Sequence, residues 1–122
     1  MKVTDLMLGD WVSINGKQVW VWTLTQHGVV GYMDGDHSYY SSEDDVEPIP
    51  LTAEILEKNG LVVGDFPMHF AEDKDFDLEL SMYGSEVWWT INLQEYDIIK
   101  LGYVHELQHV LKDCKIKKEI VL

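Results

Sequence analysis

The sequence predicts an α+β protein that begins with a small β-barrel. Short runs rich in β-branched and aromatic residues fill residues 1–50, with a turn signal about every 8–12 residues. Another alternating run begins near residue 76, and residues 103–114 repeat their apolar positions with a helical period. We therefore expect an SH3-like small β-barrel over residues 1–50. It packs against an α+β segment over residues 51–122 that has a short antiparallel sheet and one longer helix.

Four strands joined by tight turns are expected in the first part. Residues 10–14 alternate polar and apolar side chains, as a half-buried strand does, and Asn15-Gly16 follows them. This dipeptide favours a two-residue hairpin because both of its positions adopt positive φ readily. The remaining strands are predicted at residues 17–25, 29–33 and 37–41.

The second of these strands is apolar on both faces. Its residues Val19 and Val21 share one face. The opposite face carries three larger side chains, Trp20, Trp22 and Leu24. One face is expected to fill the core, and the other either packs against residues 51–122 or presents an aromatic groove that binds an extended peptide. The partner-binding residues we expect are Trp20, Trp22, Tyr39 and Tyr40.

The second segment is predicted to begin after Pro48-Ile49-Pro50, which forbids regular strand pairing. Thr52 is a favourable N-cap and Asn59-Gly60 is a left-handed stop, so a short helix is expected over residues 53–59. Three strands then follow at residues 76–82, 86–93 and 97–99, and the longer helix is expected at residues 103–114.

The charge balance excludes one class of partner and favours another. The chain carries 22 acidic residues against 9 basic ones, all of them lysines, for a formal net charge of −13. Proteins that bind nucleic acid directly carry clustered Lys and Arg, so direct nucleic-acid binding is not expected. Residues 34–47 hold six acids and no base. Such a stretch either solvates exposed loops, as acidic loops commonly do, or attracts a basic protein partner.

The compartment is predicted from three further observations. No apolar run approaches the ~18 residues that a membrane span needs, and no secretory leader is visible. The single cysteine, Cys114, rules out an internal disulfide, which fits a reducing compartment. We therefore expect a cytoplasmic protein without a membrane partner.

The predicted helix at residues 103–114 contains the string His105-Glu106-Leu107-Gln108-His109. On a helical wheel its apolar residues form one stripe, and His105 and His109 lie together on the opposite side. We expect both imidazoles to face bulk water, with Glu106 beside them. In this interpretation the string is the solvated face of an amphipathic helix and takes no part in metal binding or catalysis.

The same string resembles the active-site helix of zincin metallopeptidases, in which two His residues at i and i+4 bind Zn²⁺ and the intervening Glu acts as general base. The resemblance implies His105 and His109 as zinc ligands and Glu106 as the catalytic base. A third protein ligand is required, yet the positions where metzincins carry Gly and His are both lysines here. His69 or Asp97 would have to supply that ligand from upstream.

Four strings along the chain resemble those of one family. They are residues 8–12, 46–52, 54–60 and 103–109. Their order and spacing resemble a family of small proteins from gut bacteria and their phages or mobile elements. Members often carry Gln and Asn where this chain has Glu106 and His109, which implies that the zincin-like string is not a site. No activity is assigned to the family.

The first hypothesis is therefore a non-enzymatic protein-interaction module of a phage or mobile element, acting on a protein partner that is expected to be basic. The alternative is a minimal zinc metallopeptidase with Zn²⁺ as its cofactor. A homodimer paired through the Trp-rich face is a third interpretation. Salt-sensitive binding, metal content and solution mass distinguish the three.

Overall fold

The computed structural model describes residues 1–60, 78–83, 86–92, 96–113 and 119–122. The chain forms two compact units. The first is built from residues 1–50 and 103–118, and the second from residues 51–102 and 119–122. Neither helix within the described ranges combines the length and the apolar character needed to cross a membrane.

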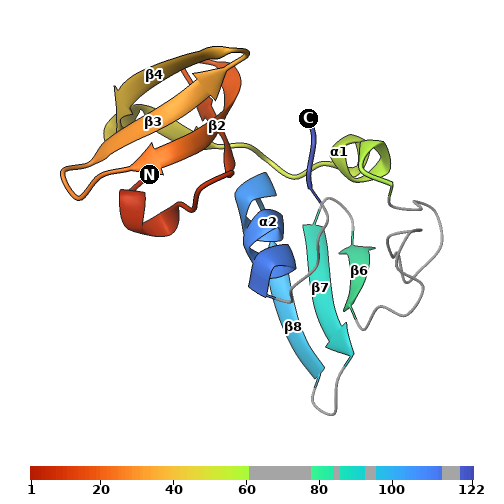
Figure 1. Ribbon diagram of the computed structural model, residues 1–122. Coiled ribbons are helices and arrows are strands. Elements are labelled where there is room, and N and C mark those ends of the chain that lie inside the picture. The colour runs from red at the N-terminus through yellow and green to blue at the C-terminus, as the bar shows by residue number, and fades with distance from the viewer. Residues whose placement is uncertain (61–77, 84–85, 93–95, 114–118) are drawn as a thin grey trace. The chain divides into compact units, whose positions relative to one another are not determined.

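The first unit contains an open antiparallel sheet of five strands in the order β4-β3-β2-β1-β5 (Figure 1). Its strands are β1 (Trp11–Ile14), β2 (Lys17–Leu24), β3 (Val29–Asp34), β4 (His37–Ser42) and β5 (Val46–Pro48). The α+β class is confirmed, but the predicted SH3-like barrel is not, because β4 and β5 are separate edges of an open sheet. β5 is only three residues long and ends at Pro48, which cannot donate a ladder hydrogen bond.

Two short 3-10 segments flank this sheet, η1 (Val3–Asp5) and η2 (Glu43–Asp45). The hairpin turns use residues that tolerate positive φ, as the sequence predicts. Asn15 and Gly16 have φ of 52° and 79° and join β1 to β2. Gly35, with φ of 62°, lies in the turn that joins β3 to β4.

The core of the first unit lies on one face of the sheet. Val12 and Val19 are paired across β1 and β2, and both are buried. Because strand side chains alternate between faces, the neighbouring pair of Trp11 and Trp20 lies on the opposite face, which we call the outer face. The buried core consists of Leu6, Val12, Ile14, Val19, Val21, Val30 and Val46.

A β-bulge at Trp22 changes the alternation along β2. Residues 21 and 23 pair with consecutive residues of β3, so Trp22 is an extra residue in this ladder. The insertion leaves both Trp22 and Thr23 on the outer face and returns Leu24 to the core side, where it packs against the core. The prediction that Leu24 shares a face with Trp22 is therefore wrong. The strict alternation assumed for a regular strand does not reveal an inserted residue.

Gly31 provides the space that this arrangement needs. A Cβ atom at position 31 would lie 2.3 Å from Thr23 Cγ2 and 3.1 Å from Trp22 Nε1. The indole of Trp22 therefore lies over a strand position that has no side chain. The indole also meets the ring of Tyr40, with the ring centroids 6.0 Å apart and the rings tilted by 58°.

The second unit holds helix α1 (Ala53–Lys58) and an antiparallel sheet in the order β6-β7-β8. Its strands are β6 (Leu78–Tyr83), β7 (Glu86–Asn92) and β8 (Tyr96–Leu101). As predicted, the Thr52 hydroxyl caps α1 by accepting a hydrogen bond from Ile55 N, and Gly60 follows the helix with φ of 88°. The side chain of Asn59 binds both the N–H and the carbonyl of Val121, which fixes the last residues of the chain to this unit.

Gly31→Ala is expected to destabilise the first unit by about 1–3 kcal/mol, because the added methyl group overpacks the outer face. Thr23→Ser removes Cγ2 of Thr23, the methyl group that the side chain added by Gly31→Ala would contact. In the Thr23→Ser background we expect the cost of Gly31→Ala to fall by at least about 0.5 kcal/mol. Urea unfolding followed by tryptophan fluorescence measures both costs, and equal costs in the two backgrounds would contradict the contact.

Candidate functional site

Helix α2 (Val104–Asp113) belongs to the first unit and carries the zincin-like string. The predicted helix is confirmed, and its stripe residues Val104, Leu107 and Leu111 are buried as the wheel predicts. The helix is anchored where it begins: Val104 N donates a hydrogen bond to Ile49 O, and the preceding residue forms an isolated bridge with Pro50.

Glu106 has a structural role at the beginning of α2. Its Oε1 atom accepts a hydrogen bond from the backbone N–H of Tyr103 at 3.0 Å. Tyr103 is the N-cap position and Glu106 the third residue of the helix, so this contact is one half of a capping box, the bond from the N-cap N–H to the side chain of the third residue. The carboxylate is therefore used to satisfy a donor that the helix itself leaves unpaired.

The polar face of α2 holds the loop that precedes β1. Gln108 Oε1 accepts from Trp11 N at 2.8 Å, and Gln108 Nε2 donates to Gly9 O at 2.9 Å. One turn later, Lys112 Nζ donates to Leu8 O. Residues 8–12 and 103–109 are thus in direct contact.

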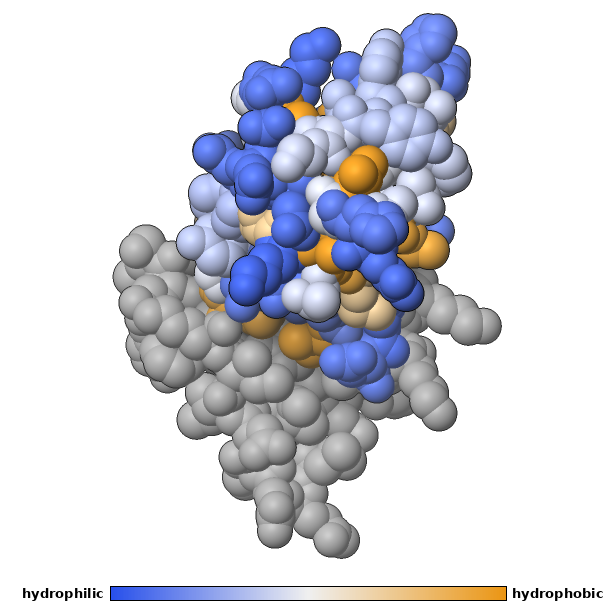
Figure 2. All heavy atoms as spheres, turned by 90° about the vertical axis from the view of Figure 1, so that its left-hand side faces the viewer, coloured by the Kyte–Doolittle hydropathy of each residue, from blue (hydrophilic) through white to orange (hydrophobic). Residues whose placement is uncertain are grey.

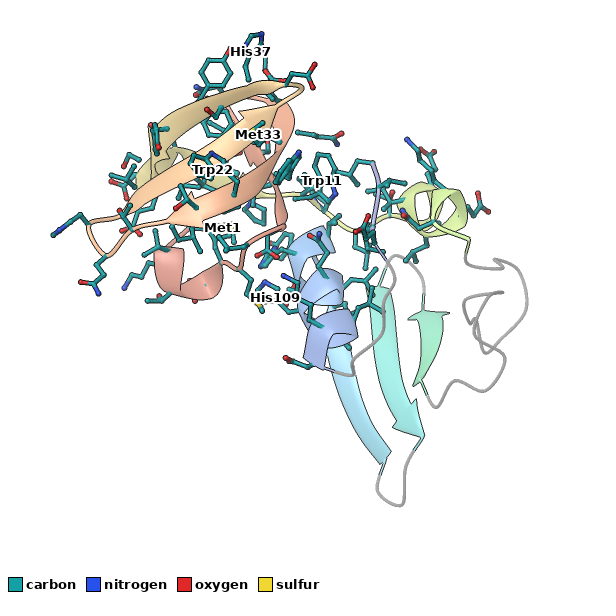
Figure 3. All side chains as sticks on the ribbon, in the orientation of Figure 1. Met1, Trp11, Trp22, Met33, His37 and His109 are labelled. Atoms are coloured by element: carbon teal, nitrogen blue, oxygen red, sulfur yellow. The ribbon has the colours of Figure 1, made fainter. Side chains whose placement is uncertain are left out.

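Asp10 lies at the centre of this contact and is fully buried, with 0% of its surface exposed. Its Oδ2 atom accepts a hydrogen bond from Met7 N at 2.8 Å and lies 2.7 Å from His109 Nε2. His109 projects from α2 toward the N-terminal part of the chain (Figure 3). The other carboxylate oxygen, Oδ1, is buried without a hydrogen-bond partner.

His105 is buried, with 7% of its surface exposed, so the prediction that both imidazoles face bulk water is wrong. Its ring centroid lies 5.9 Å from that of Tyr103 and 5.4 Å from that of His109, and its Nδ1 atom has no partner. Burial lowers the pKa of His105 below its usual value of 6.5, an effect that the charge of Asp10 opposes. The helical wheel identifies the apolar stripe but not the loop that covers the opposite side.

An open cleft of about 650 Å³ lies beside this cluster, entirely within the first unit. The residues lining it include Asp5, Met7, Pro48, Tyr103, His105 and His109. A buried carboxylate in contact with an imidazole can orient that ring. The cleft therefore combines titratable groups with solvent access.

The described side chains do not form a metal centre as they stand: among them, no group of three His, Cys, Asp or Glu residues is placed to hold one ion. Asp10 contacts His109 directly, and Glu106 caps the helix. His69 and Asp97, the upstream candidates for a third ligand, lie outside the residues whose side chains are described. The zinc alternative therefore stays a prediction.

The aromatic residues expected to bind a partner divide between the two faces of the sheet. Trp20 pairs with Met33, and Gly31 pairs with Tyr40, so these positions share the outer face with Trp22. Trp20 and Trp22 are each 38% exposed, and Tyr40 is 63% exposed. They form the aromatic face, defined as Trp20, Trp22 and Tyr40.

Tyr39 lies on the opposite face, which the sequence prediction did not distinguish. It pairs with Tyr32, and the two rings stack with their centroids 5.6 Å apart. Tyr32 packs against the core, whereas Tyr39 is exposed because β4 is an edge strand. The edge of the sheet at β4 therefore has an exposed tyrosine on each face.

Acidic side chains lie at both ends of β4. Asp34 and Asp36 precede it, and Glu43, Asp44 and Asp45 form η2 directly after it. Lys17 pairs with Asp34 at 3.4 Å, but both side chains are largely exposed and such a pair contributes little. Hydrophilic residues cover much of the described surface on the side shown in Figure 2, with apolar residues in small separate patches.

Two residues that shape these sites were missed by sequence reasoning, and one of them left a signal. Asp10 stands two positions before Val12 and four before Ile14, so the period of a strand places its carboxylate on the core side. A charged residue in that position indicates a buried partner. Gly31 left no comparable signal, because its role depends on the bulge in the neighbouring strand.

The stability of the protein is expected to decrease as the pH falls below about 6.5, because of His105. In the unfolded chain His105 takes up a proton near its usual pKa of 6.5, whereas in the folded protein its lowered pKa delays protonation. The unfolded state therefore binds more protons in this window. The contribution of His105 to the free energy of unfolding is complete above the pKa that it has in the unfolded chain. It is lost as the pH falls through the lower pKa of the folded protein.

Denaturant unfolding at about pH 7.5 and about pH 5.5 measures this dependence. We expect His105→Gln to reduce the loss of stability on acidification. His27→Gln, in an exposed turn, serves as the control and should behave as the unsubstituted protein does. The same acid dependence in His105→Gln and in the unsubstituted protein would refute this origin.

Comparison of the chain with protein-family models, with curated proteins and with solved structures finds no match.

Proposed function

We propose that this protein is a non-enzymatic protein-interaction module that binds a basic partner through the outer face of its five-stranded sheet. One observation carries the proposal: Trp20, Trp22 and Tyr40 are exposed together on that face. Tyr39 is exposed at the same edge of the sheet and extends the surface around β4.

The aromatic face has the properties of a binding surface. Trp and Tyr side chains supply much of the binding energy at protein interfaces, because they bury a large area and lose little rotamer freedom. The indole of Trp22 packs close to Gly31, where no side chain is in the way, and contacts the ring of Tyr40. The surface is therefore preorganised, and these side chains lose less conformational entropy when a partner binds.

The charge of the segment that forms the five-stranded sheet indicates the kind of partner. Residues 1–50 contain eight acidic residues and two lysines. Such a field repels nucleic acid and anionic membranes and attracts a basic protein. A cytoplasmic location, a phage or mobile-element origin and an SH3-like character of the sheet are parts of the proposal that rest on the sequence.

Binding to arrays of basic peptides tests the proposal, with the same peptides carrying Glu in place of Lys and Arg as the comparison. We expect basic peptides alone to bind, and their affinity to fall at least about tenfold between about 50 mM and about 500 mM NaCl, because exposed charges are screened. Trp22→Ala and Tyr40→Ala are each expected to lower affinity about tenfold or more, as hot-spot residues do.

Tyr103→Ala is the matched control for the aromatic substitutions, because Tyr103 is also exposed but lies at the beginning of α2. It should leave peptide affinity unchanged. Equal binding of basic and acidic peptides, or equal loss in all three variants, would refute the proposal. A solution mass of two chains, lost in Trp20→Ala, would instead support the homodimer.

A minimal zinc metallopeptidase is the second candidate. It is favoured by the neighbouring rings of His105 and His109 and by the unpartnered buried atoms Asp10 Oδ1 and His105 Nδ1. Protein purified without chelators is expected to contain far less than one zinc ion per chain. About one zinc per chain, lost in His109→Ala, would support the peptidase.

Glu106→Gln separates the two roles of this residue. The amide oxygen can still accept from Tyr103 N, so we expect the free energy of unfolding to change by less than about 0.5 kcal/mol. In a zinc peptidase the same substitution removes the general base and abolishes proteolysis. Proteolytic activity that disappears in this stable variant would replace the interaction proposal.

A further inference from the structure

Strand β4 is an edge of the five-stranded sheet and, among the described strands, pairs with β3 alone. Edge strands of natural proteins are commonly protected by lysines, prolines or bulges that prevent another strand from pairing with them. The sequence of β4 is His-Ser-Tyr-Tyr-Ser-Ser, without lysine or proline, and its register with β3 is unbroken. The strand therefore keeps the geometry that a further strand requires.

The register of β4 fixes which of its backbone groups point away from β3. Asp34 and His37 close a two-residue turn, and Glu43 N donates to Gly28 O at 2.8 Å at the other end of the ladder. Hydrogen-bonded and non-hydrogen-bonded pairs alternate along an antiparallel ladder. Tyr39 and Ser41 therefore bond to β3. The backbone groups of three residues point toward the open edge: Ser38, Tyr40 and Ser42.

Aromatic side chains lie beside this edge on both faces. Tyr40 stands next to Trp22 on the outer face, and Tyr39 stacks on Tyr32 on the opposite face. Side chains of an added strand would alternate between the two faces in the same way. Each face thus offers a tyrosine to alternate residues of an incoming segment.

Charge indicates which segment fits. Asp34 and Asp36 lie at one end of β4. At the other end Asp44 and Asp45 of η2 are exposed, whereas the carboxylate of Glu43 accepts a hydrogen bond from Val3 N. A second copy of this chain, paired antiparallel through β4, would place the acids of each end beside those of the other end, which is repulsive. An extended segment with basic residues at both ends would instead meet opposite charge at each end.

We propose that the partner adds to the sheet as a sixth strand along β4, through an extended segment with an alternating centre and basic residues at both ends. This inference rests on the proposed function and specifies the binding mode of the same partner. Backbone hydrogen bonds to Ser38, Tyr40 and Ser42 hold the segment, and the tyrosines on the two faces select its side chains.

Amide hydrogen exchange of the 122-residue chain, followed by NMR, tests the binding mode. The probe is a synthetic peptide with two lysines at each end of a short alternating Thr-Val centre, and the comparison peptide carries glutamates in place of the lysines. The lysine peptide is expected to slow exchange at least about tenfold at Ser38, Tyr40 and Ser42. Exchange at Tyr39 and Ser41 should change little, because these amides already bond to β3.

Ser42→Pro provides a second, independent test. The φ of Ser42 is −66°, which proline adopts without strain, and the substitution removes one donor that points toward the edge. We expect it to weaken peptide binding about fivefold or more. Ser42→Ala removes the same hydroxyl but keeps the N–H, so its affinity should match that of the unsubstituted protein.

The outcomes separate this inference from the proposed function. Basic-peptide binding that is lost in Trp22→Ala but leaves exchange along β4 unchanged would overturn the sixth strand and retain the interaction module. If amide exchange along β4 slows as the protein concentration rises in the absence of peptide, the edge pairs with a second copy of the chain. That result would overturn the inference. Equal affinities of Ser42→Pro and Ser42→Ala would also overturn it.

Discussion

The first unit depends on one buried carboxylate, that of Asp10. Its backbone N–H donates to Met7 O and its carbonyl accepts from Val21 N, so the residue fixes both the loop before β1 and the end of that strand on β2. Its side chain accepts from Met7 N and contacts His109 on α2. An unpaired buried charge is strongly destabilising, by several kcal/mol. Burial of Asp10 is therefore favourable only when the loop, the sheet and the helix are all in place and supply its partners.

The elements of this protein are largely predictable because local signals determine them. Asn15-Gly16 forms the expected hairpin, Thr52 caps the expected helix, and the apolar stripe of α2 is buried. Each of these features depends on residues within about four positions of one another, which a single sequence displays directly. The order of strands β1 to β4 follows for the same reason, since each hairpin joins neighbours in the chain.

The candidate sites were less predictable because they depend on contacts between distant positions. The wheel of α2 gives no indication that residues 7–11 cover its polar face, so His105 was expected in water and is buried. The bulge at Trp22 has no local signal, yet it decides which side chains surround Gly31. The local pattern also did not show whether the sheet closes into a barrel. That depends on β5, and its short pairing with β1 is visible only in the structure.

The position of α2 in the chain has a consequence for biosynthesis. Asp10 and His109 are separated by 99 positions, and the whole of residues 51–102 lies between the two parts of the first unit. A nascent chain emerges from the ribosome N-terminus first, so the five-stranded sheet is translated long before the histidine that contacts its carboxylate. Until α2 has been synthesised, the carboxylate of Asp10 must stay hydrated, and the unit reaches its native state only after translation of the helix.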